Sequence, residues 1–199
     1  MITLYSSDYT GTPGNCSYPH KHVVTDLETL RAAVERDYVC AEYKNNYRNG
    51  ENFLSSDCLP VDCDNDHSED PNDWVMPADV FEAFPGVTFA VHYSRSHMRE
   101  KHGKPARPKF HVLFPISPMT DPIAYKEMKR MVNSVFPYFD NNALDAARFF
   151  FGTNNPETKR EFSEECGYQT VIAPTSALNG SGEVIERFEK DTVSLVPVS

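Results

Sequence analysis

The sequence has no long hydrophobic run. No stretch of about 18 consecutive apolar residues occurs among its 199 residues, which argues against a membrane-spanning helix. The first residues, MITLYSSDYTGTPG, lack a basic segment followed by an apolar one, so we expect no secretory signal. We therefore expect no membrane partner and a cytoplasmic location.

Paired cysteines are also missing. The five cysteines are Cys16, Cys40, Cys58, Cys63 and Cys166, and no two of them form a CxxC pair. This spacing argues against a zinc ribbon and against a disulfide framework. Cys16 could share a metal with His20 and His22, but free thiols in a reducing cytosol are the simpler interpretation.

Positive charge is scarce, since 19 Lys and Arg face 29 Asp and Glu, giving a net charge of −10. Most nucleic-acid-binding proteins are instead basic. The charge is uneven, however: residues 95–109 (RSHMREKHGKPARPK) are basic, and acids concentrate in residues 57–73. An acidic centre beside a basic strip suits a protein that holds a metal and a polyanion together, although a solvated loop with incidental lysines gives the same pattern.

Hydrophobic periodicity predicts a mixed domain of class α/β or α+β. Helices are expected at residues 25–36, 76–84 and 121–136. The first helix has a capping box of Thr25 and Glu28, and the third begins at Asp121 with Pro122 in its first turn.

Strands are expected at residues 37–44, 53–65, 86–97, 109–117, 147–155 and 168–174. The segments 86–97 and 109–117 flank a long basic connection, and we expect them to pair as a hairpin. Residues 1–24 look irregular, and residues from about 170 to 199 look like a C-terminal extension. We treat residues 1–199 as a single domain because no linker divides them.

Two carboxylates stand one residue apart at the end of an apolar strand, in the segment LPVDCDN. Side chains alternate along a strand, so Asp62 and Asp64 share one face and Cys63 points into the packing. Two such acids repel one another, and a divalent cation between them relieves the repulsion. Oxygen ligands favour Mg²⁺ or Mn²⁺ over zinc. The alternative is a solvated pair of acids at a strand end.

A histidine lies inside the apolar strand PKFHVLFP. Phe110 and Val112 lie on the face opposite His111, and Lys109 shares the face of His111. The neighbouring cations Arg107 and Lys109 favour a phosphate contact, whereas a satisfied core histidine is the ordinary alternative. His97, which follows Ser96 in SRSH, is a second candidate for the same role.

A third group of candidates lies in YFDNNALDAARFFFG. Either Asp140 or Asp145 could complete a three-acid metal centre. Arg148 has the planar, permanently charged guanidinium that suits a phosphate clamp. Alternatively, Asp145 pairs with Arg148 and Asp140 caps a turn. We interpret the three phenylalanines at 149–151 as core residues.

Taken in order, these segments resemble the archaeo-eukaryotic primase (AEP) superfamily, in particular the primase-polymerase domains of phages and plasmids. The resemblance covers roughly residues 47 to 152, from YRNGENF through VDCDN, HYSRSH and KFHVLFP to FDNNALDAARFFFG. It implies an RRM-like sheet packed with a second α/β unit.

The resemblance also implies site residues. Asp62 and Asp64 match the first motif and His111 the second, with His97 and Ser96 as a rival match. Asp140 matches the third motif, with Asp145 as the alternative. Lys109 departs from the family, which usually has a small residue there.

The implied activity is DNA-templated primase-polymerase catalysis, in which two divalent ions, Mg²⁺ or Mn²⁺, support nucleotidyl transfer. The implied partners are a single-stranded DNA template and nucleoside triphosphates. Arg48, Arg107, Lys109 and Arg148 are candidate nucleotide or template contacts. Because an acidic chain binds DNA weakly by itself, we also expect a helicase domain or subunit as a partner.

Two other functions fit parts of the pattern. A metal-dependent replication-initiator nuclease would use the same acids, with Tyr93 or Tyr125 as nucleophile, but such enzymes generally require paired histidines. A non-catalytic RRM-like module would bind single-stranded nucleic acid by stacking bases on the phenylalanines at 149–151.

Overall fold

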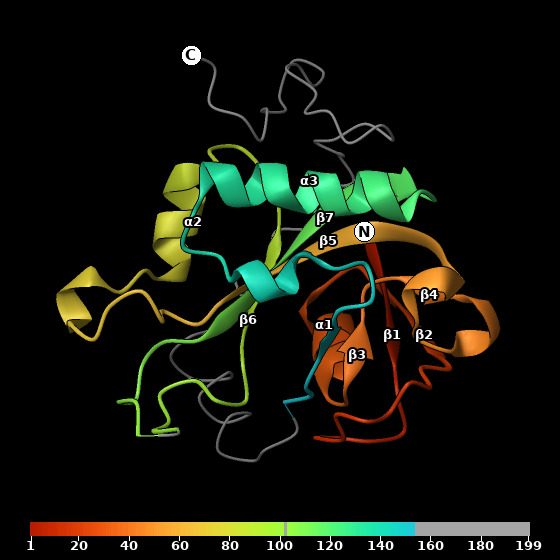
Figure 1. The fold of residues 1–199 in the computed structure, drawn as a ribbon, viewed down its shortest axis with the longest axis horizontal. Coiled ribbons are helices and arrows are strands. Elements are labelled where there is room, and N and C mark those ends of the chain that lie inside the picture. The colour runs from red at the N-terminus through yellow and green to blue at the C-terminus, as the bar shows by residue number, and fades with distance from the viewer. Residues whose placement is uncertain (102, 154–199) are drawn as a thin grey trace.

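The computed structural model describes residues 1–101 and 103–153, which contain two four-stranded antiparallel sheets (Figure 1). In spatial order, the first sheet contains β2 (His20–Val24), β1 (Ile2–Ser6), β3 (Tyr38–Val39) and β8 (Phe149–Phe150). The second contains β4 (Glu42–Tyr43), β5 (Phe53–Cys63), β7 (Phe110–Met119) and β6 (Ala90–Tyr93). The predicted mixed α+β class is confirmed.

Three α-helices accompany the sheets in the described residues: α1 (Leu27–Val34), α2 (Pro77–Ala83) and α3 (Pro122–Val135). Short 3₁₀ turns are present at Lys44–Asn46, Gly50–Asn52, Pro71–Asp73 and Asn141–Leu144. Helix α1 packs on β1 and β2, whereas α3 lies across β5 and β7 (Figure 1). None of these helices is long and apolar enough to span a membrane.

The amino-terminal region corrects two expectations. Residues 1–24 are not irregular, because β1 and β2 pair over their full length and bury Ile2 and Leu4. The Gly- and Pro-containing stretch is the connection between these strands. Helix α1 is capped by Asp26 and not by Thr25: the Asp26 carboxylate accepts a hydrogen bond from the Thr29 N–H, and the Thr29 hydroxyl oxygen accepts one from the Asp26 N–H in return.

The segment predicted as one strand at 37–44 contributes to both sheets. β3 pairs with β1 and β8, and β4 pairs with the start of β5. Cys40 and Ala41, both buried, link the two strands. Each strand is therefore much shorter than periodicity suggested, because the chain passes from one sheet to the other between them.

The central strands of the second sheet follow the sequence closely. β7 pairs with β5 and with β6, so the predicted hairpin of β6 and β7 is confirmed. β6 covers only part of the predicted 86–97. Pro60 lies inside β5 opposite Leu113, beyond the short segment that pairs with β4. β5 has a single neighbouring strand there, so the missing proline N–H does not disrupt a second ladder.

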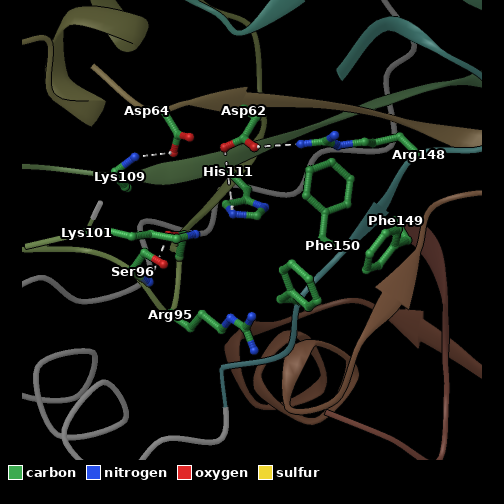
Figure 2. A pocket seen from close by; sticks show the side chains of 12 residues that line it. Asp62, Asp64, Arg95, Ser96, Lys101, Lys109, His111, Arg148, Phe149 and Phe150 are labelled. Carbon is green, nitrogen blue, oxygen red and sulfur yellow. Dashed lines mark hydrogen bonds and ion pairs between the residues drawn. The ribbon is translucent and has the colours of Figure 1, made fainter. Parts of the chain in front are cut away.

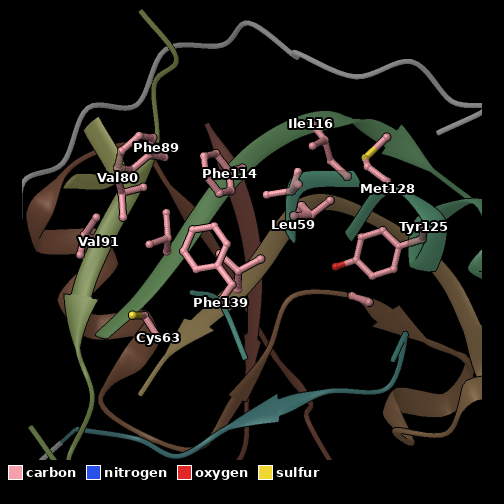
Figure 3. Packing of buried hydrophobic residues seen from close by; sticks show 14 of the residues in the cluster. Leu59, Cys63, Val80, Phe89, Val91, Phe114, Ile116, Tyr125, Met128 and Phe139 are labelled. Atoms are coloured by element: carbon pink, nitrogen blue, oxygen red, sulfur yellow. The ribbon is translucent and has the colours of Figure 1, made fainter. Parts of the chain in front are cut away.

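The second sheet has one wholly apolar face, which packs beneath α2 and α3 (Figure 3). Alternate residues Leu59, Val61 and Cys63 of β5 belong to this core. Helix α3 covers them with an apolar stripe that includes Tyr125, Met128 and Val132, and the Asp121 carboxylate caps its start by accepting a hydrogen bond from the Ile123 N–H.

The opposite face of the second sheet packs against the first sheet. Cys58, Ala90 and Leu113 join a smaller apolar cluster with Leu4 and Phe150. Polar residues of this same face lie at the junction of the two sheets, where the candidate site is formed. The predicted strand 168–174 and the extension 170–199 fall outside the described residues.

Candidate functional site

Three carboxylates meet where β5 ends. Asp62, Asp64 and Asp140 each present an oxygen atom, and these oxygens lie within 4.8 Å of one another. Asp140 arrives from the segment after α3, and its N–H donates a hydrogen bond of 2.7 Å to the Asp62 carbonyl. This bond links the two segments directly, so the three acids converge through the backbone and not through side-chain reach alone.

Asp145, the alternative third ligand, lies outside this group. Its side chain is exposed and its Oδ1 accepts a hydrogen bond from the Ala147 N–H. Among the described residues, the only set of acids, histidines and cysteines placed to share a metal is Asp62, Asp64 and Asp140. Cys16, His20 and His22 do not form such a set, since His20 contacts Asp8 and His22 contacts Ser6.

Asp62 is 6% exposed, and one of its oxygens has no hydrogen-bond donor in the described chain. Arg148 donates a long hydrogen bond of 3.3 Å to Oδ2, whereas Oδ1 is the orphaned oxygen. Burial and the charges of Asp64 and Asp140 raise the pKa of Asp62 to about 7, with Arg148 opposing the shift. An unsatisfied buried oxygen facing two further carboxylates is the donor set that a hard divalent cation requires.

His111 lies directly opposite Asp62 in the β5–β7 ladder. Its Nε2 is 3.8 Å from Asp62 Oδ1, which is too far for a hydrogen bond. Burial, with repulsion from His92 and Arg148, lowers the pKa of His111 well below its ordinary value. His111 is therefore a neutral imidazole with one N–H to donate, and its buried Nδ1 has no partner in the described chain.

Aromatic rings hold His111 in place from two sides. The His92 ring stacks on it at a centroid distance of 4.8 Å, and the Phe150 ring meets it edge-on at 4.7 Å. His92 in turn lies 2.7 Å from the Tyr38 hydroxyl through Nε2, and burial lowers the pKa of His92 to about 4. His92 could not be selected from local patterns, because only the pairing register of β6 and β7 places it beside His111.

A pocket opens in front of these groups (Figure 2). We call it the central pocket; it is lined by Asp62, Asp64, Ser94, Arg95, Ser96, Lys101, Lys109, His111, Arg148, Phe149, Phe150 and Phe151. Lys109 Nζ lies 3.2 Å from Asp64 Oδ1, and Arg148 reaches Asp62 from the other side. The pocket therefore combines an acidic cluster with four cationic side chains.

The phenylalanines at 149–151 are more than core residues. Phe150 is buried, as expected, but Phe149 and Phe151 are only partly buried, and all three line the central pocket. Arg48 stacks over Phe149 at 4.7 Å and donates a hydrogen bond to the Ala147 carbonyl. Arg48 thus supports the pocket wall and does not line the pocket itself.

The structure does not bring His97 or Arg107 into the central pocket. His97 packs on the Tyr93 ring at 3.9 Å, and its Nδ1 accepts a hydrogen bond from the Lys109 N–H. Arg107 is 1% exposed and donates a hydrogen bond of 2.8 Å to the Asn65 carbonyl. Its guanidinium holds the acidic loop after β5 in place, so it is not positioned to contact a ligand in the central pocket.

The tyrosines required by a nuclease mechanism also lie elsewhere. Tyr125 and Tyr93 both belong to the apolar core on the other face of the sheet. The Tyr125 hydroxyl donates a hydrogen bond to the Cys58 carbonyl, and burial raises its pKa well above the ordinary value. Neither hydroxyl is therefore available beside the acidic cluster.

Comparison with solved structures finds a likeness to the AEP domain of the primase-polymerase of cyanophage S-2L, at 17% sequence identity and a TM-score of 0.41. The likeness covers 76% of this chain and 72% of that chain. No protein-family model and no curated protein matches this chain. A likeness at this level carries no functional argument, so the function depends on the geometry of the site.

Proposed function

We propose that the chain is a metal-dependent nucleotidyltransferase of the primase-polymerase kind, which joins nucleoside triphosphates on a single-stranded DNA template. One observation carries this proposal: the orphaned, buried oxygen of Asp62 faces Asp64 and Asp140 beside a pocket lined by cations. In this proposal residues 1–199 form one catalytic domain, with an RRM-like sheet of the kind that the family resemblance implies.

The three acids would hold two divalent ions, Mg²⁺ or Mn²⁺. When bound, such ions activate the attacking hydroxyl and neutralise the triphosphate. Asp62 would coordinate through Oδ1, which has no hydrogen-bond partner among the described residues, and its protonated fraction would fall as metal binds.

The other pocket residues would position the triphosphate. His111, a neutral imidazole fixed by two rings, would donate one N–H to a phosphate oxygen. Lys109 and Arg148, now paired with Asp64 and Asp62, would turn to the phosphates once metal neutralises those acids. Ser96, at the pocket wall, offers a further hydroxyl. Groups held in place beforehand lower the barrier because they need not reorganise during the reaction.

A test of this proposal incubates the protein with Mn²⁺ or Mg²⁺, a single-stranded template and labelled nucleoside triphosphates. We expect new oligonucleotide product that is lost in Asp62→Ala, Asp64→Ala and Asp140→Ala. Asp145→Asn is the matched control, since it removes an acid from the same chain segment but outside the cluster.

Other outcomes separate the competing functions. Cleavage of the template without synthesis would identify a nuclease. Template binding that ignores metal chelation and all three acid substitutions would identify a binding module, for which the pocket-lining Phe149 and Phe151 offer stacking surfaces. Activity that survives Asp62→Ala would refute the proposed metal site.

A further inference from the structure

A second hollow adjoins the central pocket. We call it the flanking pocket; it is lined by Thr10, Arg95, Ser96, Arg99, Glu100, Lys101 and Gly152. Arg95, Ser96 and Lys101 line both pockets, so the two are continuous through these three residues. The flanking pocket contains three cations and one acid, Glu100, whereas Asp62 and Asp64 line the central pocket and not the flanking one.

Arg95 is fixed between the two pockets. Its guanidinium lies 3.8 Å from the Phe151 ring centroid, and none of the described residues accepts a hydrogen bond from it. In Figure 2 Arg95 lies across the central pocket from Asp62 and Asp64. Stacking immobilises the planar group but leaves its N–H donors without an acceptor among residues 1–101 and 103–153, which is the arrangement that suits binding of a phosphate.

Gly11 makes room for this arginine. It has a φ of +78°, and a Cβ atom there would lie 2.6 Å from Arg95 Nη1. Any side chain at position 11 would therefore be strained and would displace the guanidinium.

A buried carboxylate fixes the walls of the flanking pocket. Asp37 is fully buried, and its Oδ1 accepts hydrogen bonds of 2.8 Å from the N–H groups of Gly11 and Gly152. Its Oδ2 accepts a third from the Thr12 N–H at 2.9 Å. One acid thus links the loop after β1 to the segment that follows β8, and these hydrogen bonds hold two walls of the flanking pocket in place.

We propose that the flanking pocket binds a phosphodiester group of the single-stranded template, with Arg95 as its anchor. This proposal deepens the function proposed above and depends on it. A polymer with regularly spaced anions can occupy both pockets at once, with aromatic rings beside its bases and cations along its backbone. A phosphate from the tail of a free nucleotide has the same chemistry, and the experiment must distinguish the two sources.

The test measures two affinities separately. Binding of a fluorescent oligothymidylate is followed by anisotropy in EDTA, as a function of salt, and binding of a fluorescent nucleoside triphosphate is followed with Mn²⁺. In Arg95→Ala we expect oligonucleotide affinity to fall about tenfold, the loss of one charge-assisted contact. The slope of log affinity against log salt should become shallower by about 0.7, as expected for one lost phosphate contact to a single strand. Nucleotide affinity should stay within twofold.

Two further variants sharpen the result. Arg130→Ala removes the same charge from α3, where Arg130 pairs with Glu127, and should leave both affinities unchanged. Arg95→Lys keeps the charge but loses the planar guanidinium that stacks on Phe151. Its oligonucleotide affinity should lie between those of the wild type and Arg95→Ala.

The inference is overturned if Arg95→Ala binds the oligonucleotide as the wild type does, if the wild type does not bind it, or if oligonucleotide and nucleotide affinities fall together. The last outcome would assign the phosphate to the nucleotide tail. Failure of the proposed function would give a different result: Mn²⁺-dependent nucleotide binding would survive Asp62→Ala.

Discussion

The two faces of the β5–β7 pair are built from alternate residues of the same strands, yet one face is apolar and the other buries polar side chains. On one face Leu59, Val61 and Phe114 are fully or almost fully buried among apolar side chains. On the other, Asp62 and His111 are nearly as buried but keep polar atoms that have no partner in the described part of the chain. One face stabilises the fold, and the other holds groups whose burial costs stability.

This difference relates the candidate site to the stability of the fold. An unpaired buried oxygen costs free energy that the apolar face beneath α2 and α3 must offset. Unsatisfied buried polar groups in a folded protein are characteristic of functional sites, because a bound ligand can supply the missing interactions. The division between an apolar face that stabilises the fold and a polar face that holds the candidate site can be tested by substitution.

The largest effect is expected on the apolar face. Phe89 is fully buried, stacks on Phe81 at 4.5 Å and lies 5.1 Å from the Phe114 ring. We expect Phe89→Ala to lower the free energy of unfolding by about 3–5 kcal/mol, measured by urea denaturation. Activity per folded molecule should change little. If Phe89→Ala instead lowered activity and left the free energy of unfolding unchanged, the division between a stabilising face and a functional face would be wrong.

The next effect is expected on the polar face. Asp62→Asn keeps the shape of the side chain but removes the charge that would bind metal. An outer-sphere partner of a metal site is worth 10–100-fold, so loss of a direct ligand should lower nucleotidyl transfer by more than about a hundredfold. Primer-extension rates at saturating Mn²⁺ measure this. If Asp62→Asn kept more than a tenth of the wild-type activity, Asp62 would not be a metal ligand.

The same variant should change stability in the opposite direction. The pKa of Asp62 is about 7 in the folded chain, against 3.8 for an unperturbed carboxyl. The folded state therefore binds the extra proton between about pH 4 and 7, and this group makes the metal-free protein less stable as pH rises through that window. We expect Asp62→Asn to be more stable than the wild type at pH 8 in EDTA, by a few kcal/mol at most.

Thermal unfolding at pH 5, 6, 7 and 8 checks this expectation. The difference between wild type and Asp62→Asn should grow with pH and level off above about pH 7. Added Mn²⁺ should stabilise only the wild type, because the variant lacks the carboxylate. A pH-independent difference between the two proteins would contradict the assigned burial of Asp62.

The smallest effect is expected at the edge of the pocket. Lys109 Nζ lies 3.2 Å from Asp64 Oδ1, and the Lys109 side chain is 11% exposed. We expect Lys109→Met to raise the KM for nucleoside triphosphate about tenfold, because a charge-assisted contact to phosphate is lost. kcat should change less. Lys126→Met, on α3, is the matched control, and an equal effect there would show that only the net charge matters.

Local patterns in the sequence predicted much of the site. The alternation in β5 placed Asp62 and Asp64 on one face and Cys63 in the core, and the structure agrees. The apolar stripe and the Asp121 cap of α3 were likewise predictable. In each case neighbouring residues settle the outcome, through a period of 2.0 or 3.6 or through a cap.

Local patterns did not decide the questions that depend on distant segments meeting. The choice between Asp140 and Asp145 depended on one backbone hydrogen bond from Asp140 to Asp62. The basic strip looked uniform in sequence, yet Arg107 is buried against Asn65 while Arg95 faces the two pockets. Nothing in the local pattern distinguishes these two arginines.

The sequence by itself determined which residues can share a strand face or a helix face, and hence that two acids and a histidine stand on apolar strands. Only the tertiary structure decided that Asp62 and His111 lie opposite each other, that Asp140 joins them, and that the phenylalanines after Arg148 form a pocket wall. The physical reason is that side-chain alternation follows from the geometry of a single strand. Register and the meeting of distant segments follow instead from the packing of the whole chain.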